Sequence, residues 1–155
     1  QDPAWFRTRG TDQEQVGRDG CRVPMAWEAD APAAGFNTTG ASWLPQPPSY
    51  PELAVDQQTG VPGSTLRLYR TALAERSRLG TAAGALSFVE GLPEGVFGLE
   101  VQGTAGTVTV LCNTGTTPLP LPAGATVLLD SLAGGASTAT TLEGNHTLWL
   151  DGPVG

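Results

Sequence analysis

The sequence predicts a mainly β chain in which a long irregular segment and one helix precede a small antiparallel sandwich or barrel. Three observations support this prediction. The 155 residues include 21 Gly and 13 Pro but only 15% charged residues, a composition suited to short strands and turns. Short alternating or apolar runs return at intervals of roughly ten residues after residue 84. Only residues 64–79 space their apolar side chains as a helix does.

Residues 1–61 show no sustained helical or strand period, and Gly and Pro interrupt them throughout. Irregular stretches longer than about 12 to 15 residues are uncommon in compact domains unless they are functional loops or disordered linkers. The aromatic content argues against a linker. These aromatic residues are Trp5, Phe6, Trp27, Phe36, Trp43 and Tyr50.

The helix over residues 64–79 has clear end signals. Ser64 follows Pro62-Gly63 as the N-cap, and Gly80 occupies the position after the last turn, where a left-handed residue ends many helices. Its predicted apolar stripe consists of Leu66, Tyr69, Ala72 and Leu73.

Seven strands are predicted after the helix. Their ranges are 86–89, 96–101, 107–112, 119–121, 126–130, 138–142 and 147–150. A two-residue period assigns as inward-facing the sets Leu86/Phe88, Phe97/Leu99/Val101, Val108/Val110/Cys112 and Leu148/Leu150. The prolines around residue 120 restrict that strand to an edge, and Gly134-Gly135 is expected in a turn.

The charge excludes two classes of partner. The net charge is -7, whereas nucleic acid and anionic membranes require a basic surface, so no nucleic acid and no membrane are expected as partners. No apolar run approaches the roughly 20 residues of a membrane span. A neutral partner is expected.

The strongest chemical signal is the segment from Gly17 to Trp27. Arg18 and Arg22 are four residues apart. Asp19 is adjacent to Arg18, and Trp27 follows the pair. Guanidinium groups donate to pairs of sugar hydroxyls, and an indole packs on the apolar face of a pyranose. The residues alone also fit a different interpretation, in which an Arg-Asp pair beside a tight Gly turn is a structural contact.

Other reactive side chains form no recognisable site. Asp19, Glu28 and Asp30 are not assigned as a catalytic pair, because nothing places two of them across a cleft. His146 lacks the neighbours of a triad or metal site and is expected to shape the turn before the last strand with Asn145. We therefore predict no catalytic residue, metal or cofactor, and we expect two free thiols at Cys21 and Cys112. The Asn-x-Thr patterns at Asn37 and Asn145 are interpreted as turn chemistry.

These motifs resemble the α-glucosidase and oligo-1,6-glucosidase branch of glycoside hydrolase family 13. Gly17 to Trp27 is similar to the branch's G-R-D-G-C-R-V-P-x-P-W segment, with Ala26 in place of a Pro. The other matching stretches are Gln1 to Trp5, Ala34-Gly35-Phe36, Ser42 to Pro45, Val55 to Gln58, Ser64 to Arg70, Leu119 to Gly124 and Leu148 to Leu150. The second half has fewer distinctive motifs, and Gly98-Leu99-Glu100 departs from a more basic strand.

The resemblance implies an end of a (β/α)8 barrel followed by a C-terminal β-sandwich. Residues 1–80 would be the last βα loop and final helix, and residues 81–155 the sandwich. Arg18 and Arg22 would line the pocket for the terminal glucose, with Asp19 and Trp27 in support. The family's three catalytic acids would all precede Gln1, so this chain alone would be inactive.

The expected function is therefore that of a C-terminal fragment of a retaining α-glucosidase. The complete protein would hydrolyse terminal α-linked glucose from an oligosaccharide substrate. The alternative is an autonomous, non-catalytic β-sandwich module that binds carbohydrate or has a structural role. A cytoplasmic location is expected for the parent protein. The sequence does not determine linkage preference or the balance between hydrolysis and transglycosylation.

Overall fold

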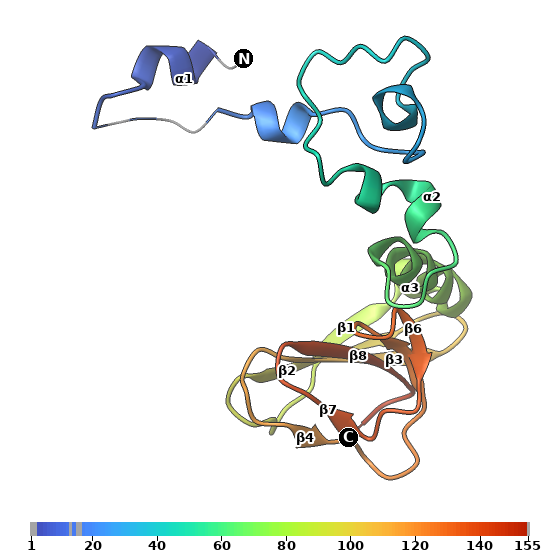
Figure 1. Ribbon diagram of the computed structural model, residues 1–155. Helices are drawn as coiled ribbons and strands as arrows, with labels where there is room; N and C mark the ends of the chain where they lie inside the picture. Colours follow the sequence, from blue (N-terminus) through green and yellow to red (C-terminus); the bar gives the residue numbers. More distant parts are fainter. Residues whose placement is uncertain (1–2, 13, 15–16, 155) are drawn as a thin grey trace. The chain divides into compact units, whose positions relative to one another are not determined.

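A computed structural model describes residues 3–12, 14 and 17–154, and the similarity noted at Gln1-Asp2 lies outside them (Figure 1). By its contacts the chain divides into two compact units, Gln1–Thr59 and Gly60–Gly155. We call them the loop unit and the sheet unit. The predicted division after residue 80 concerns the domains of a longer protein and stays a prediction.

In its described residues the loop unit contains only short helices, so the prediction of an irregular segment is confirmed. They are α1 (Pro3–Thr8), η1 (Asp19–Arg22), η2 (Pro32–Gly35), η3 (Pro51–Leu53) and α2 (Val55–Gln58). Its core is small: buried Ala26, Ala34 and Ala54 contact Ala29 and Tyr50. With little apolar area removed from water, hydrophobic burial contributes only modestly here.

Side chains that bond to the backbone hold the loop unit together. The Gln46 amide donates to the carbonyls of Pro24 and Ala33 at 3.1 and 3.0 Å. The Asn37 side chain accepts from the amides of Thr39 and Gly40 and donates to the carbonyl of Ala41. The interpretation of Asn37 as turn chemistry is thus confirmed, because its amide nitrogen is already bound within the loop.

The sheet unit begins with the predicted helix, α3 (Thr65–Leu79). The Ser64 hydroxyl accepts from the amide of Arg67 at 3.2 Å, and Gly80 ends the helix with φ 65° and ψ 35°. Both end signals are confirmed.

The predicted apolar stripe of α3 is wrong in part. Tyr69 and Leu73 are 65% and 59% exposed, whereas Leu79 is buried. Ala72 and Leu68, both half-buried, line a hollow against the sheet. Tyr69 lines the same hollow despite its exposure, so the sheet covers the predicted stripe only in part. A single helical turn, η4 (Thr81–Ala83), follows.

The strands form two antiparallel sheets, which confirms the mainly antiparallel β character of the prediction. Six strands stand in the order β1-β2-β3-β8-β5-β6, and β4 pairs with β7. Their bounds are β1 Ala85–Phe88, β2 Val96–Gln102, β3 Thr107–Asn113, β4 Leu119–Pro120, β5 Val127–Asp130, β6 Gly135–Ser137, β7 Thr141–Leu142 and β8 His146–Asp151. Figure 1 shows the short β4–β7 pair in a layer beside the larger sheet.

One predicted strand divides in the structure. The single strand predicted at 138–142 is replaced by β6 and β7, because the chain leaves one sheet after Ser137 and joins the other at Thr141. Gly134 lies in a turn with φ 68°, as expected, but Gly135 begins β6. The prediction that both glycines lie in a turn is wrong for Gly135.

The core lies on one face of the six-stranded sheet, here called the inner face. Its buried members come from β3, β5, β7 and β8, and they are Leu111, Val127, Leu142, Leu148 and Leu150. Residues directly opposite each other in an antiparallel pair share a face. Leu111 is opposite Leu148, and Thr109 is opposite Leu150. The predicted inward set of β8 is therefore confirmed.

The inward sets predicted for β1, β2 and β3 do not face this core, and of their members only Val108 is buried. Val110 is opposite Trp149 of β8 and Leu99 of β2, and Leu99 is opposite Phe88 of β1. These residues lie on the other side of the sheet, here called the outer face. The outer face of these strands is the more apolar one, so a two-residue period assigns it to the core although the core lies on the other side.

Candidate functional site

The segment from Gly17 to Trp27 is built around one 3₁₀ turn. In η1 the amide of Cys21 donates to the carbonyl of Arg18 at 3.2 Å, and the Cys21 thiol lies 3.0 Å from the same oxygen. A 3₁₀ turn brings residues i and i+3 to the same side. Asp19 and Arg22 consequently face each other, with 3.6 Å between Oδ1 and Nη1.

This ion pair is partly open to solvent. The side chains of Arg22 and Asp19 are 48% and 34% exposed. An exposed pair of this kind contributes about 0 to 1 kcal/mol to stability. Arg18 precedes the turn, and its side chain is also exposed. The turn therefore presents two guanidinium groups at the surface, with a carboxylate oriented toward one of them.

Trp27 is held through its backbone. Its amide donates to the carbonyl of Ala34 at 2.7 Å, and its carbonyl accepts from the amide of Asp56 at 3.0 Å. The Trp27 residue is about half exposed. Two neighbouring segments thus fix the position of Trp27 and leave part of its ring available for contact.

A left-handed turn supplies the carbonyl that binds Trp27. Ala33, Ala34 and Gly35 have φ values of 47°, 49° and 76°, a conformation that is uncommon for residues other than Gly. A Cβ at Gly35 would lie 2.8 Å from the backbone nitrogen of Glu28. The Gly of the Ala34-Gly35-Phe36 motif is therefore required by a close approach of the backbone.

A hollow of about 390 Å³ adjoins η1, but its lining differs from the predicted site. It is lined by Gly20, Cys21, Val23, Met25, Ala26, Tyr50 and Leu53. The predicted residues Arg18, Asp19, Arg22 and Trp27 are not among them. Tyr50 and Leu53 come from a distant part of the sequence, and no local motif marks them as neighbours of this turn.

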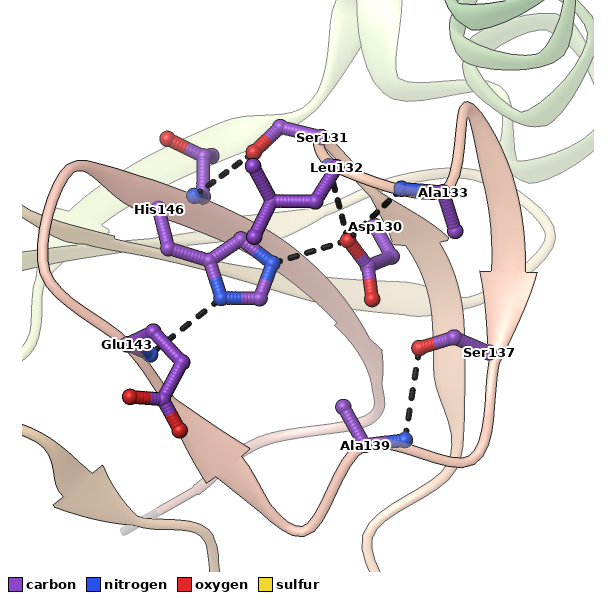
Figure 2. Close-up of polar contacts among 9 residues, drawn as sticks. Asp130, Ser131, Leu132, Ala133, Ser137, Ala139, Glu143 and His146 are labelled. Atoms are coloured by element: carbon purple, nitrogen blue, oxygen red, sulfur yellow. Dashed lines mark hydrogen bonds and ion pairs between the residues drawn. The ribbon is translucent and has the colours of Figure 1, made fainter. Parts of the chain in front are cut away.

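A second polar cluster lies in the sheet unit, where sequence reasoning assigned a turn role to His146. Figure 2 shows His146 between Asp130 and Glu143. Its Nε2 lies 2.8 Å from Asp130 Oδ1, and its Nδ1 accepts from the amide of Glu143 at 3.2 Å. Because Nδ1 accepts this bond, the ring proton is on Nε2 and points to Asp130.

Asp130 is buried and well supplied with donors. Its Oδ1 accepts from the amides of Leu132 and Ala133 at 2.8 and 3.1 Å, in addition to His146 (Figure 2). Burial by itself raises the pKa of Asp130, but hydrogen bonds from Ser137, His146 and the two amides outweigh it and lower the pKa below its ordinary value.

This cluster organises turns and offers no open site. Asp130 stabilises the turn between β5 and β6 by accepting from its backbone amides. His146 accepts from the amide of Glu143 and so stabilises the turn before β8, where Asn145 has φ 54°. The expected turn role of His146 is confirmed. Sequence reasoning missed Asp130, because a spacing of 16 residues gives no local signal.

The predictions about cysteines, metal sites and membrane helices can be compared with the described part of the chain. Cys21 and Cys112 are both free, as predicted. Within residues 3–12, 14 and 17–154 no three His, Cys, Asp or Glu side chains gather as a metal site would need. No helix in the same part of the chain is long and apolar enough to cross a membrane.

Comparisons with known proteins agree with the motifs of the loop unit. Residues 6–82 match the family model of the α-amylase catalytic domain. A probable α-glucosidase of Rhizobium meliloti is 45% identical over 75 residues, which are 48% of this chain and 13% of the relative. A salivary α-glucosidase of Anopheles gambiae is 33% identical over 124 residues, which are 78% of this chain and 20% of the relative.

Solved structures show the same relation. An α-glucosyl transfer enzyme superposes with a TM-score of 0.62 at 30% identity, over 88% of this chain and 26% of the other. The trehalulose synthase of Pseudomonas mesoacidophila MX-45 gives 0.64 at 25% identity, over 87% and 26%. The chain spans about a quarter or less of these proteins. It carries a segment of the α-amylase family, glycoside hydrolase family 13, and belongs to its α-glucosidase-like members.

Proposed function

We propose that this chain is the C-terminal part of a retaining α-glucosidase that hydrolyses terminal α-linked glucose from oligosaccharides. In this proposal residues 1–80 form the last βα loop and the final helix of a catalytic barrel, and residues 81–155 form a C-terminal β-sandwich. The match of residues 6–82 to a catalytic-domain model supports the first assignment. The small share of each relative that the chain covers supports its being a part of a longer enzyme.

The η1 turn is the observation on which the proposed site rests. Arg18 and Arg22 are exposed on one loop of the matched segment, and Asp19 lies 3.6 Å from Arg22. We assign both guanidinium groups to the pocket for the terminal glucose, where their N–H groups donate to sugar hydroxyls. Asp19 orients Arg22, and Trp27 supports the loop and offers an apolar ring surface.

Bond cleavage in this proposal depends on residues outside the chain. A retaining glycosidase needs two carboxyl groups about 5 to 5.5 Å apart on either side of the scissile bond. Glu28 and Asp30 are exposed, and Asp19 already pairs with Arg22. We therefore assign the nucleophile and the acid/base to the preceding part of the barrel, and an oligosaccharide as the substrate of the complete enzyme.

The isolated chain should accordingly show no glucosidase activity. We expect no turnover of maltose, isomaltose or an aryl α-glucoside after purification from a host without such enzymes. Sustained turnover that co-purifies with the chain would show that its own carboxylates form the active site, which would overturn the assignment above.

Arg22→Ala and Arg18→Ala should each lower kcat/KM about 10-fold or more in a complete enzyme, because a charged hydrogen bond contributes about 1.5 to 3 kcal/mol. The test enzyme is a chimera in which the part of the Rhizobium meliloti relative before its matched segment is joined to the matching segment of this chain and all residues after it. Arg22→Lys should not restore paired hydrogen bonds. Arg70→Ala, an exposed arginine of α3, is the matched control.

The alternative is an autonomous carbohydrate-binding or structural module. It is favoured by the closed leucine core of the sheet unit, which needs no other segment to bury it. Calorimetric titration of the isolated chain with maltose distinguishes the two functions. Binding without the rest of an enzyme would support the module, whereas the proposed fragment requires the remainder of the pocket.

A further inference from the structure

The inner face of the six-stranded sheet has a cavity at its β1–β2 end, here called the inner hollow. It measures about 580 Å³, a size that suits a small molecule. All of its lining residues lie between Ser87 and Val154, after α3, and Figure 1 shows β4 at the end of the sheet unit away from that helix. Its apolar lining includes Val89, Leu92, Leu111, Leu119, Pro120 and Val154.

A glycine in β2 allows the connection between β1 and β2 to form one wall of the inner hollow. A Cβ at Gly98 would lie 2.9 Å from both Val89 Cβ and Leu111 Cδ2, and 3.0 Å from Leu92 Cδ1. The amide of Val89 also donates to the carbonyl of Gly98 at 3.0 Å. The connection is therefore held close to the sheet, with apolar side chains toward the inner hollow.

A carboxylate stands among these apolar side chains. Glu100 is opposite Ser87 in β1 and opposite Thr109 in β3, and Thr109 is opposite Leu150 of the core. Because residues opposite each other share a face, Glu100 and Ser87 both lie on the inner face, and both line the inner hollow. Glu100 is half-buried, and Glu90, an exposed residue of the connection, lines the same cavity.

The polar groups of the inner hollow differ from their neighbour in having no partner. Thr109, on the same face, donates its hydroxyl to the carbonyl of Gly152 at 2.8 Å. Within residues 3–12, 14 and 17–154, neither the Glu100 carboxylate nor the Ser87 hydroxyl makes a hydrogen bond or an ion pair. Carboxylates withdrawn from water are normally paired, because desolvation of a charge costs free energy. Glu100 is therefore available to a ligand.

The charge of this part of the chain selects the class of ligand. All eight basic side chains precede Leu79, and the one histidine, His146, is bonded to Asp130. A cavity lined by charges of one sign attracts the opposite sign. An anion would be repelled, and an apolar ligand would leave the Glu100 carboxylate without a partner. The carboxylates after Leu79 belong to Glu90, Glu94, Glu100, Asp130, Glu143 and Asp151.

We propose that the inner hollow binds a small organic cation, an ammonium ion that carries an apolar body. The ammonium group donates to the Glu100 carboxylate and the Ser87 hydroxyl, and Glu90 adds a second negative charge nearby. The apolar body lies against Leu92 and Leu119. This site goes beyond the proposed function and does not depend on it, because it uses neither the η1 turn nor any other part of an enzyme.

The first test titrates the full 155-residue chain with phenethylamine and follows its backbone amides by NMR. We expect saturable shifts in residues 87–92 and 119–122. Phenethyl alcohol carries a hydroxyl in place of the ammonium group, and phenylacetate carries a carboxylate. Both should bind at least about 10-fold more weakly than phenethylamine, because only the ammonium ion forms a charge-paired hydrogen bond with Glu100.

The second test removes the charge of Glu100. Glu100→Gln keeps the size of the side chain and should weaken the binding of phenethylamine about 10-fold or more. Glu143→Gln, at an exposed carboxylate of the sheet unit outside the inner hollow, is the matched control and should change binding less than about twofold. Ser87→Ala, at an exposed position, should weaken binding about threefold and tests the site even if Glu100→Gln does not fold.

Equal weakening by Glu100→Gln and Glu143→Gln would overturn the proposal, because the attraction would then come from the acidic surface in general. Equal binding of phenethyl alcohol, or displacement of phenethylamine by maltose, would also overturn it. A dimer of the chain that Glu100→Gln dissociates would place a second copy in the inner hollow and exclude a small ligand. The Arg18 and Arg22 variants of the chimera test the proposed function separately, so the failure of one proposal is distinguishable from the failure of the other.

Discussion

The two units of this chain achieve order in different ways. In the sheet unit, four leucines and one valine from four strands close a core, and each buried leucine contributes about 1.5 to 3 kcal/mol relative to exposure. In the loop unit, three buried alanines and a set of side-chain hydrogen bonds define the path of the backbone. Hydrogen bonds of this kind specify geometry more than they add stability. We therefore expect the loop unit, which holds the candidate site, to be the less stable of the two.

The sharpest test of this comparison is hydrogen exchange on the isolated chain. Amides of residues 107–113 and 146–151 should exchange about a thousandfold or more slowly than those of residues 17–58, because a core of a few kcal/mol protects only the strands that form it. Equal protection in both ranges, measured by mass spectrometry, would show a single cooperative domain.

A matched pair of leucines tests the same difference by substitution. Leu148 and Leu44 are both buried, one in the sheet unit and one in the loop unit. Leu148→Ala should lower the free energy of unfolding of the main transition by about 2 to 5 kcal/mol. Leu44→Ala should leave that transition within about 0.5 kcal/mol of the unsubstituted protein. A similar loss from both, in urea unfolding, would contradict the comparison.

A smaller effect is expected from Asp130→Asn, about 1 to 3 kcal/mol at pH 7, since the buried carboxylate loses charged hydrogen bonds. The pKa of Asp130 is lowered in the folded state, so its contribution is complete above its unfolded pKa near 3.9 and disappears as the pH falls through the lower folded value.

The difference in thermal midpoint between Asp130→Asn and the unsubstituted chain should therefore shrink below about pH 4. Melting curves at pH 7, 5, 4 and 3 measure it. A difference that stays constant down to pH 3 would show that the carboxylate's charge has no part in the stability.

Local signals accounted for much of the fold. The ends of α3 follow from Ser64 and Gly80, whose cap and left-handed conformation depend on their own chemistry. Most strand positions follow from apolar runs between turns. The face assignment in β1 to β3 failed, because the more apolar side of these strands is not the side that holds the core.

Less of the candidate site can be predicted from the sequence. The motif around Arg18 and Arg22 was recognised from its residues, and its role stays a prediction. Contacts between distant segments left no trace in the pattern: Tyr50 beside Cys21 and Asp130 beside His146 are brought together only by the fold.

The polar residues of β3 have a consequence for the specificity of the fold. A strand that is apolar on both sides could slide by one residue and still bury leucine and valine. Asn113 opposes such a shift, because its buried amide group donates to the carbonyl of Leu142 in β7 as well as to the carbonyl of Thr117. Thr109 adds a second reference point through its bond to the carbonyl of Gly152. A redesigned sheet with leucine in place of Asn113 and Thr109 would have a more apolar interior, and several strand alignments would compete.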